Sequence, residues 1–280
     1  MPGGNSVSQK VRRRTRKKTT KKVVFDKYEF YTKAVQSPDG DVEFFKNVYK
    51  ELRQKTPRVL REDFCGTGLL CAAWVKAHSS HAAFGVDLDP EPLEYGRNRF
   101  IGKLRPDQQK RIELLEKNVL AKDLPNADVS VGLNFSYFLF KTRPQMLAYF
   151  RNVLAHLKPR GLAFFDVFGG SQCQDAIEDR TKHKGFTYYW DQTGFDPVSN
   201  EAVFHIHFKV GGRKIERVFT YDWRLWSIPE LKELMLEAGF KKVHVYWEGT
   251  ARDGTGNGVF TRVEKGEACL SWIAYLVGEK

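Results

Sequence analysis

Two short stretches, residues 58–68 and 84–90, constrain what this chain can fold into more than any other feature of its sequence. The first reads as a strand that runs into a glycine-bearing turn, and the second reads as a strand that ends in the acid Asp87. With a helix between them, this order places the turn and the acid at the carboxyl edge of a parallel sheet. There the backbone can approach a ligand closely, and the acid can accept hydrogen bonds from a ribose. A cofactor that contains a nucleoside is therefore the first expectation.

The residues around the turn separate two classes of nucleoside cofactor. A dinucleotide fingerprint needs a third glycine three residues after Gly68, where the helix packs closely on the strand, and Cys71 stands there instead. Glu62 and Asp63 add negative charge where a pyrophosphate would approach, and the first helical turn contains no basic residue to offset it. The pattern therefore favours a ligand with an ammonium or sulfonium group over a dinucleotide.

The turn also carries a resemblance to a known family. The run Arg61-Glu62-Asp63-Phe64-Cys65-Gly66-Thr67 resembles motif I of the class I S-adenosylmethionine-dependent methyltransferases, in the form found in a sub-family of bacterial proteins. Glu62 matches the acid of that motif, and Gly66 and Gly68 match its later glycines. Phe64 stands where the first glycine is usual. The resemblance continues in order through residue 168 and, more loosely, over 225–280.

This resemblance implies a set of residues around S-adenosyl-L-methionine as cofactor. Asp87 would bind the ribose hydroxyls with Leu88 beside the adenine, and residues of the N-terminal helices would close over the cofactor. Arg61 would meet the cofactor carboxylate, or it would face away, because neighbouring strand residues point to opposite sides. The implied cofactor-binding residues are Tyr31, Gln36, Arg61, Glu62, Cys65, Gly66, Thr67, Gly68, Asp87, Leu88, Asn118, Val119 and Asn134.

The segment Asp128–Tyr137 resembles motif IV, which implies that Asn134 and Tyr137 lie next to the transferred methyl group. Enzymes that methylate exocyclic amino groups of bases usually carry two prolines between these positions, and this chain has neither. Cytosine-C5 enzymes need a cysteine after a proline, and no such pair occurs here. We therefore expect methyl transfer to a nitrogen or oxygen nucleophile of a small molecule. An RNA or protein acceptor is one alternative, and a binding module without catalysis is another.

A second pattern follows the predicted fifth strand. Residues 202–210 alternate between apolar and polar side chains, and Gly211-Gly212 forms a hairpin turn into residues 214–223. With a further strand at 185–191, this predicts an antiparallel sheet inserted at about residues 171–226, where the resembling enzymes build their substrate cover. The loop at 249–258 is expected at the opposite end of the sheet from the cofactor.

Two histidines share the polar face of the alternating strand. His205 or His207 could act as a general base if that face points into the cleft, and otherwise they are a solvated pair. A metal site is not expected, because the sequence identifies no third ligand. The four cysteines have no zinc-ligand spacing, which favours a reducing, cytoplasmic setting.

These patterns together predict an α/β protein with a Rossmann-like, seven-stranded methyltransferase sheet whose last strand is reversed. The predicted organisation is a basic tail at 1–22, an N-terminal helical cap at 23–56 and a methyltransferase domain at 57–280. Helices are expected at 26–35 and 41–52, separated by Ser37-Pro38-Asp39-Gly40. No apolar run is long enough to span a membrane. The sequence does not indicate an oligomeric state.

The net charge of +12 is concentrated in the predicted tail. Residues 1–22 contain nine basic residues and no acid, which leaves +3 for residues 23–280. A tail of this kind lacks apolar periodicity and is expected to be disordered. Through residues 10–22 it would bind RNA or another polyanion, or it would be a solvated extension.

Overall fold

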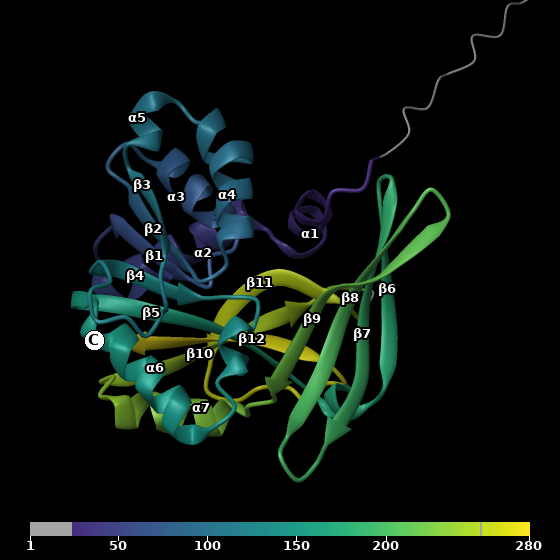
Figure 1. Cartoon of the computed structure of the whole chain (residues 1–280). Coiled ribbons are helices and arrows are strands. Elements are labelled where there is room, and N and C mark those ends of the chain that lie inside the picture. The colour runs from purple at the N-terminus through teal and green to yellow at the C-terminus, as the bar shows by residue number, and fades with distance from the viewer. Residues whose placement is uncertain (1–23, 253) are drawn as a thin grey trace, which may run out of the picture.

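A computed structural model describes residues 24–252 and 254–280 of the chain (Figure 1). Its larger sheet has eight strands in the order β11-β10-β12-β5-β4-β1-β2-β3. The strands are β1 (Val59–Asp63), β2 (Ala82–Asp87), β3 (Ile112–Glu116), β4 (Ala127–Gly132), β5 (Leu157–Gly169), β10 (Lys242–Thr250), β11 (Gly256–Val263) and β12 (Trp272–Glu279). β1 to β5 pair in parallel, and β12 is antiparallel to β5. The reversed last strand is confirmed, but β11 extends the sheet beyond the seven strands predicted.

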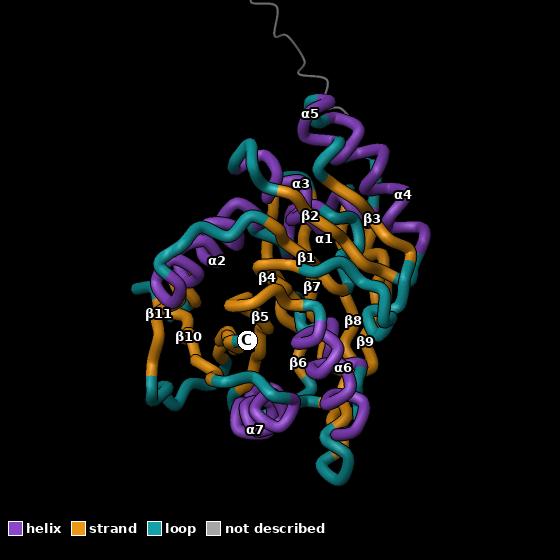
Figure 2. Tube along the Cα trace, turned by 90° about the vertical axis from the view of Figure 1, so that its left-hand side faces the viewer, coloured by secondary structure: helices purple, strands orange, loops and turns teal. Residues whose placement is uncertain are grey.

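Helices cover both faces of this sheet (Figure 2). The helices of the described chain are α1 (Lys27–Val35), α2 (Pro38–Arg53), α3 (Leu69–Ala77), α4 (Pro90–Arg99), α5 (Pro106–Gln109), α6 (Arg143–Ala155) and α7 (Ile228–Ala238). α2 and α3 belong to the apolar core on one face, and α6 and α7 belong to the core on the other. β5 serves both cores, because Phe164 and Phe165 point to opposite faces and are fully buried.

Local signals set most of the helix boundaries. Ser227 and Glu230 form the predicted capping box of α7, and Gly239 ends that helix with a φ of 109°. The segment 37–40 is not a linker, which corrects the expectation from sequence. α2 begins at Pro38, because proline suits the first helical position, where no backbone N–H is needed.

A smaller, four-stranded antiparallel sheet lies beside the carboxyl edge of the larger one (Figure 1). Its strands are β6 (Ile177–His183), β7 (Phe186–Asp196), β8 (Glu201–Val210) and β9 (Arg213–Arg224). The last three were predicted, and β6 was not. β6 is an exposed edge strand with one apolar residue, Ile177, so it carries no alternation that would indicate a strand.

α1 lies between the smaller sheet and α4 (Figure 1). Its Phe30 ring is stacked on Phe186 of β7, with the two ring centroids 4.4 Å apart. On the other side, the Tyr95 hydroxyl of α4 donates to the Asp26 carboxylate at 3.0 Å. Asp26 also caps α1, since it accepts from the backbone N–H of Tyr28. α1 therefore joins two parts of the protein that are far apart in the sequence.

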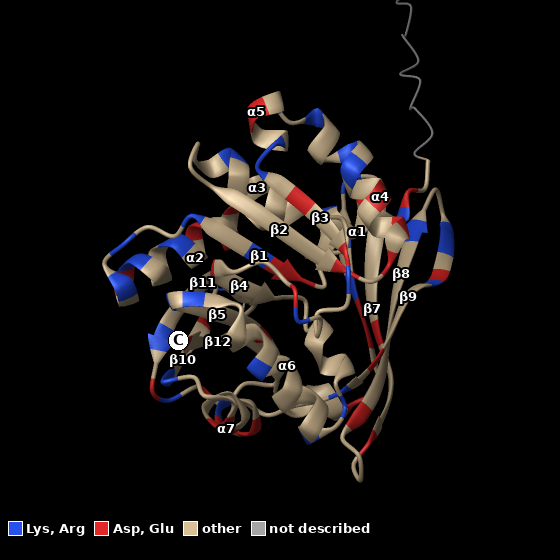
Figure 3. Ribbon diagram, turned by 60° about the vertical axis from the view of Figure 1, so that its left-hand side comes forward, with Lys and Arg blue, Asp and Glu red and all other residues tan. Residues whose placement is uncertain are grey.

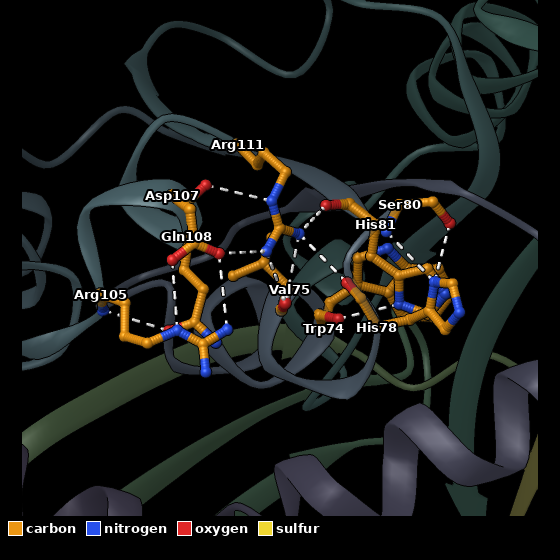
Figure 4. Close-up of polar contacts among 9 residues, drawn as sticks. All are labelled: Trp74, Val75, His78, Ser80, His81, Arg105, Asp107, Gln108 and Arg111. Atoms are coloured by element: carbon orange, nitrogen blue, oxygen red, sulfur yellow. Dashed lines mark hydrogen bonds and ion pairs between the residues drawn. The ribbon is translucent and has the colours of Figure 1, made fainter.

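The amino edge of the larger sheet is fastened by Arg111, directly before β3 (Figure 4). Its guanidinium donates to the carbonyl oxygens of Val75 at 3.2 Å and His78 at 3.1 Å, and also to that of His81. The His81 ring stacks on Trp74 of α3. These bonds satisfy carbonyl groups at and beyond the end of α3, which otherwise have no partner within the helix.

Basic and acidic residues are both spread along the described chain (Figure 3). The basic run at 10–22 lies outside the described residues. Within the part of the chain that the structure describes, no helix has the length and apolar character needed to cross a membrane.

Candidate active site

Three adjoining cavities lie at the carboxyl edge of the larger sheet. Among the described residues, Asn134 alone lines all three, just after β4. The glycine-loop cavity, of about 310 Å³, is lined by residues that include Tyr31, Gln36, Cys65, Gly66, Thr67, Asp87, Asn134, Ser136 and Tyr221. The acidic cavity, also of about 310 Å³, is lined by residues that include Gln36, Asp41, Glu62, Asn134, Asp166 and Glu248. The aromatic cavity, of about 230 Å³, is lined by residues that include Tyr31, Asn134, Phe135, Tyr188, Trp190, Tyr221 and Trp223.

The turn after β1 takes its shape from three residues with positive φ. Gly66 and Gly68 have φ values of 52° and 63°, and a Cβ atom on Gly68 would lie 2.7 Å from the Leu114 side chain. Phe64 also has a positive φ, 59°, at the position where the resembling motif has its first glycine. A non-glycine residue in this region costs about 1–3 kcal/mol. The turn thus keeps its left-handed backbone without that glycine.

Asp87 lies across this turn at the end of β2. Its Oδ2 accepts from the backbone N–H of Gly66 at 2.7 Å, and its Oδ1 accepts from the N–H of Asp89 at 3.0 Å. Asp89 caps α4, as the following proline indicated. The structure therefore brings the glycine turn and the acid together, at the edge where a nucleoside would bind.

Two further polar groups at this edge are available to a ligand. Thr67 is 4% exposed, and its Oγ1 has no hydrogen-bond partner among the described residues. The Oε1 of Gln36 is likewise buried and unpartnered within the described part of the chain. Buried polar atoms usually have partners, so unpaired ones beside a cavity fit a site for a polar ligand.

Three of the implied cofactor-binding residues lie outside the cavity lining. Leu88 is 64% exposed, Asn118 is exposed, and Val119 is buried in the core. None of the three lines the glycine-loop cavity as described. The Asn118 side-chain oxygen accepts from the N–H of Leu120 at 2.8 Å. Their roles remain predictions.

Arg61 faces away from the cavities, and this corrects its place among the cofactor ligands. It is fully buried and forms a two-pronged pair with Asp63, at 2.9 and 3.2 Å. The Tyr149 hydroxyl also donates to Asp63, at 3.2 Å. Arg61 and Asp63 share one face of β1, while Glu62 between them points to the other. The sequence suggested that Asp63 adds negative charge beside the cofactor. In the structure it does not, because its carboxylate lies on the other face of the strand.

Tyr137 is also misplaced by the sequence prediction. It is fully buried in the core, and its hydroxyl donates to the backbone oxygen of Asp166 at 2.8 Å. Ser136 lines the glycine-loop cavity in its stead, together with Asn134. A short 3-10 helix begins at Ser136, which turns the Tyr137 side chain inward.

His205 does not face the cleft, so the condition for its role as a base is not met. Ile206 lines the aromatic cavity, and His205 points to the opposite face of β8, where its Nδ1 lies 2.9 Å from the Thr220 hydroxyl. His205 and His207 are 6% and 4% exposed, so they are not a solvated pair either. Burial lowers the pKa of His205.

His207 lies in a charged cluster that the sequence did not reveal. Its Nε2 is 3.1 Å from Asp191 and 3.8 Å from Glu178, and the three side chains have the spacing of a metal site. However, Nδ1 accepts a hydrogen bond from the backbone N–H of Arg217 at 2.8 Å. Nε2 therefore carries the ring proton and donates it to the Asp191 carboxylate. Lys214 pairs with Glu178. These contacts make the group an ion-pair cluster.

The acidic cavity gathers carboxyl groups from four elements. Burial raises the pKa of Glu62 to about 8, that of Asp166 to about 7 and that of Asp41 to about 6. The Cys71 thiol donates to Glu62 at 3.2 Å. Glu248, at the end of β10, completes the group. Carboxyl groups that are costly to ionise alone are suited to a cationic ligand.

The loop at 249–258 does not lie where the sequence predicted, because Glu248 and Phe260 on either side of it line the acidic cavity. β10 and β5 are both antiparallel to β12, so β10 is parallel to β5 and ends at the carboxyl edge. The loop therefore begins on the cofactor side of the sheet.

Asp166 fixes the turn that carries Asn134. Its two carboxylate oxygens accept from the backbone N–H groups of Asn134 at 2.7 Å and Phe135 at 3.0 Å. Both residues have positive φ, 53° and 56°. Such a backbone needs support from its surroundings. The sequence offered one signal for Asp166, a single acid within the apolar run of β5.

The aromatic cavity lies between this turn and the smaller sheet. β7 contributes Tyr188 and Trp190, and β9 contributes Tyr221 and Trp223. The Tyr31 hydroxyl of α1 is hydrogen-bonded to that of Tyr221. Because Tyr31 and Tyr221 also line the glycine-loop cavity, the two cavities share a wall.

Comparison with known proteins relates this part of the chain to a described family. Residues 65–163 match the family described as "Methyltransferase domain". This part of the chain is a methyltransferase domain. No curated protein sequence matches the chain.

Solved structures share the fold of this methyltransferase at low sequence identity. An S-adenosylmethionine-dependent methyltransferase from Clostridium acetobutylicum has a TM-score of 0.65 and 17% identity, and the match covers 90% of this chain and 96% of that one. The amino pentose methyltransferase CalS10 from Micromonospora echinaspora has a TM-score of 0.62 and 16% identity, over 91% and 99%. The sugar N-methyltransferase KedS8 from a Streptoalloteichus species has a TM-score of 0.61 and 17% identity, over 99% of both chains.

Proposed function

We propose that this methyltransferase transfers the methyl group of S-adenosyl-L-methionine to a nitrogen or oxygen nucleophile of a small molecule held in the aromatic cavity. The observation that carries the proposal is the position of Asn134, which borders the glycine-loop, acidic and aromatic cavities together. A methyl group can pass between two ligands only where their sites meet.

In this proposal the glycine-loop cavity holds the nucleoside of the cofactor, with Asp87 on the ribose and Gly66 beneath it. The methionine part extends toward Glu62 and Asn134, so that the carboxyl groups of the acidic cavity face its ammonium and sulfonium charges. The unpaired oxygens of Thr67 and Gln36 supply further polar contacts.

The residues around the methyl group act mainly by position. A sulfonium methyl is already reactive, so alignment of the nucleophile with the S–C bond and exclusion of water supply most of the rate. Asp166 holds the Asn134 turn rigid, and the smaller sheet and α1 cover the acceptor. The names of CalS10 and KedS8 support a small acceptor, since both describe enzymes that act on sugars.

Two measurements test the proposal. Calorimetry should show binding of S-adenosylhomocysteine and no comparable binding of NAD, and NAD binding alone would overturn it. Incubation of a metabolite extract with S-adenosyl-L-methionine labelled in its methyl group should then yield labelled small molecules. Label found only in RNA or protein would replace the small-molecule acceptor with a macromolecule.

A further inference from the structure

We propose that the acceptor carries its nucleophile as an amine, and that the methylated, cationic product rests against the ring faces of Trp190, Tyr221 and Trp223. This inference rests on the proposed function and names the chemical class of the acceptor. It is carried by the aromatic wall of the cavity, by the signs of the charges around it, and by the proton that each kind of nucleophile has to lose.

The wall consists of rings on one face of the smaller sheet. Tyr221 and Trp223 are stacked, with ring centroids 4.5 Å apart and 22° between the planes. Trp190 lies 6.2 Å from Trp223 at 37°. Phe135 and Phe168 also line the cavity, with their ring centroids 4.6 Å apart. Aromatic faces carry negative electrostatic potential, so a cation within about 6 Å of a ring is attracted to it.

The charged groups around the cavities have one sign. Asp179 is the only charged side chain in the aromatic lining as described. The acidic cavity next to it contributes four carboxyl groups, and its described lining contains no lysine, arginine or histidine. An anionic acceptor such as a carboxylate or phosphate would find no counter-charge there. A positive charge on the acceptor would be stabilised.

The required proton movements favour an amine over a hydroxyl. When an amine attacks, its lone pair forms the N–CH3 bond, and the electron pair of the S–CH3 bond remains on sulfur. The nitrogen becomes an ammonium and can release its proton afterwards. A hydroxyl must instead lose its proton to a base as the O–CH3 bond forms.

Apart from the Asp179 carboxylate, the described lining of the aromatic cavity contains no group suited to act as such a base. Its lining, as far as the structure describes it, contains no histidine, because His205 and His207 point to the other face of β8. Burial raises the pKa of Tyr31 to about 12, and it also raises the pKa of Tyr221 well above its ordinary value. Both oxygens of Asp166 already accept backbone N–H groups. An amine needs none of these groups to act as a base in the transfer step.

A pair of probes with the same shape and different charge tests the inference. Choline and 3,3-dimethyl-1-butanol differ in the replacement of the quaternary nitrogen by carbon. Each would be titrated, by NMR, into the full-length protein saturated with S-adenosylhomocysteine. We expect choline to bind about tenfold more tightly, from one or two ring faces at about 0.5–2 kcal/mol each. Equal affinity, or no saturable choline binding, would overturn the inference.

Variants of the aromatic residues test which rings bind the cation. Trp190→Leu and Trp223→Leu should each weaken choline binding about 3- to 30-fold and leave the neutral probe unchanged. Trp190→Phe keeps a ring face and should lose less, which preserves the test if a leucine variant does not fold. Trp247→Leu is the matched control, since Trp247 pairs with Trp272 outside the aromatic cavity. An equal loss in this control would contradict the assignment.

The same samples separate the two proposals. Failure of S-adenosylhomocysteine to bind would refute the proposed function. Normal binding of S-adenosylhomocysteine without a preference for choline would refute only the amine.

Discussion

The buried pair of Arg61 and Asp63 gives a prediction that distinguishes the structure from the sequence motif. If Arg61 met the cofactor carboxylate, Arg61→Met would weaken cofactor binding. In the structure, both side chains have no exposed surface, and two hydrogen bonds join them. We therefore expect Arg61→Met to lower stability and to leave the affinity for S-adenosylhomocysteine unchanged.

The size of the loss follows from burial. Removal of one partner of a buried pair leaves an uncompensated charge and costs about 3–5 kcal/mol. The Tyr149 hydroxyl still donates to Asp63 in the variant, which places the loss toward the lower figure. Replacement of both partners by apolar residues, Arg61→Met with Asp63→Leu, should recover most of it, since buried pairs are often replaceable at little net cost.

Urea unfolding of the single and double variants measures these free energies, and calorimetry on the folded proteins measures cofactor affinity. Arg53→Met is a suitable control, because Arg53 is buried and paired with Glu279 at the opposite edge of the sheet. A variant of Arg61 with wild-type stability and a tenfold or greater loss of cofactor affinity (about 1.4 kcal/mol or more) would refute the reasoning.

Four further predictions concern charge. Asp87→Ala should weaken cofactor binding by about 2–4 kcal/mol, because two charge-assisted hydrogen bonds to the ribose are lost; an unchanged affinity in calorimetry would mean that another acid binds it. Between pH 5.5 and 8.5, calorimetry should show S-adenosyl-L-methionine gaining affinity relative to S-adenosylhomocysteine, because Asp41, Asp166 and Glu62 ionise at pKa values of about 6, 7 and 8 and then face the sulfonium. A constant affinity ratio would contradict the placement of the sulfonium. Over the same pH range the unliganded protein should lose stability, because folding raises the pKa values of these three carboxyl groups and the stability gained in this way is lost as the pH rises through them. Deletion of residues 1–22 should abolish salt-sensitive retention on heparin and preserve small-molecule methylation; loss of methylation with intact cofactor binding would assign the tail to the acceptor site.

The sequence predicted the approach of the glycine turn to Asp87 well, because its signals there are local. A strand, a turn with Gly66 and Gly68, and an acid at position 87 follow one another within thirty residues, and the structure joins Gly66 to Asp87 directly. The alternation of β8 and the capping box of α7 are equally local, and both were confirmed.

One error came from a local pair that the motif concealed, and the other differences arose where long-range packing decides the outcome. Arg61 and Asp63 lie two residues apart on one strand, so their opposite charges on one face indicated an ion pair. The resemblance to motif I led instead to a role for Arg61 at the cofactor. Asp41 and Asp166 join Glu62 only through the packing of α2 and β5, and no spacing in the sequence relates them. β6 and β11 have polar or glycine-rich sequences, and they are strands because they pair with β7 and β10.

The position of α1 has a consequence for the kinetics of the enzyme. Tyr31 walls both the glycine-loop and aromatic cavities, and Phe30 anchors the same helix to the smaller sheet. If α1 detaches, the glycine-loop and aromatic cavities open together, so S-adenosylhomocysteine and the methylated product leave by the same route. We expect their departure, rather than the chemical step, to limit repeated turnover, and the first turnover to appear as a burst.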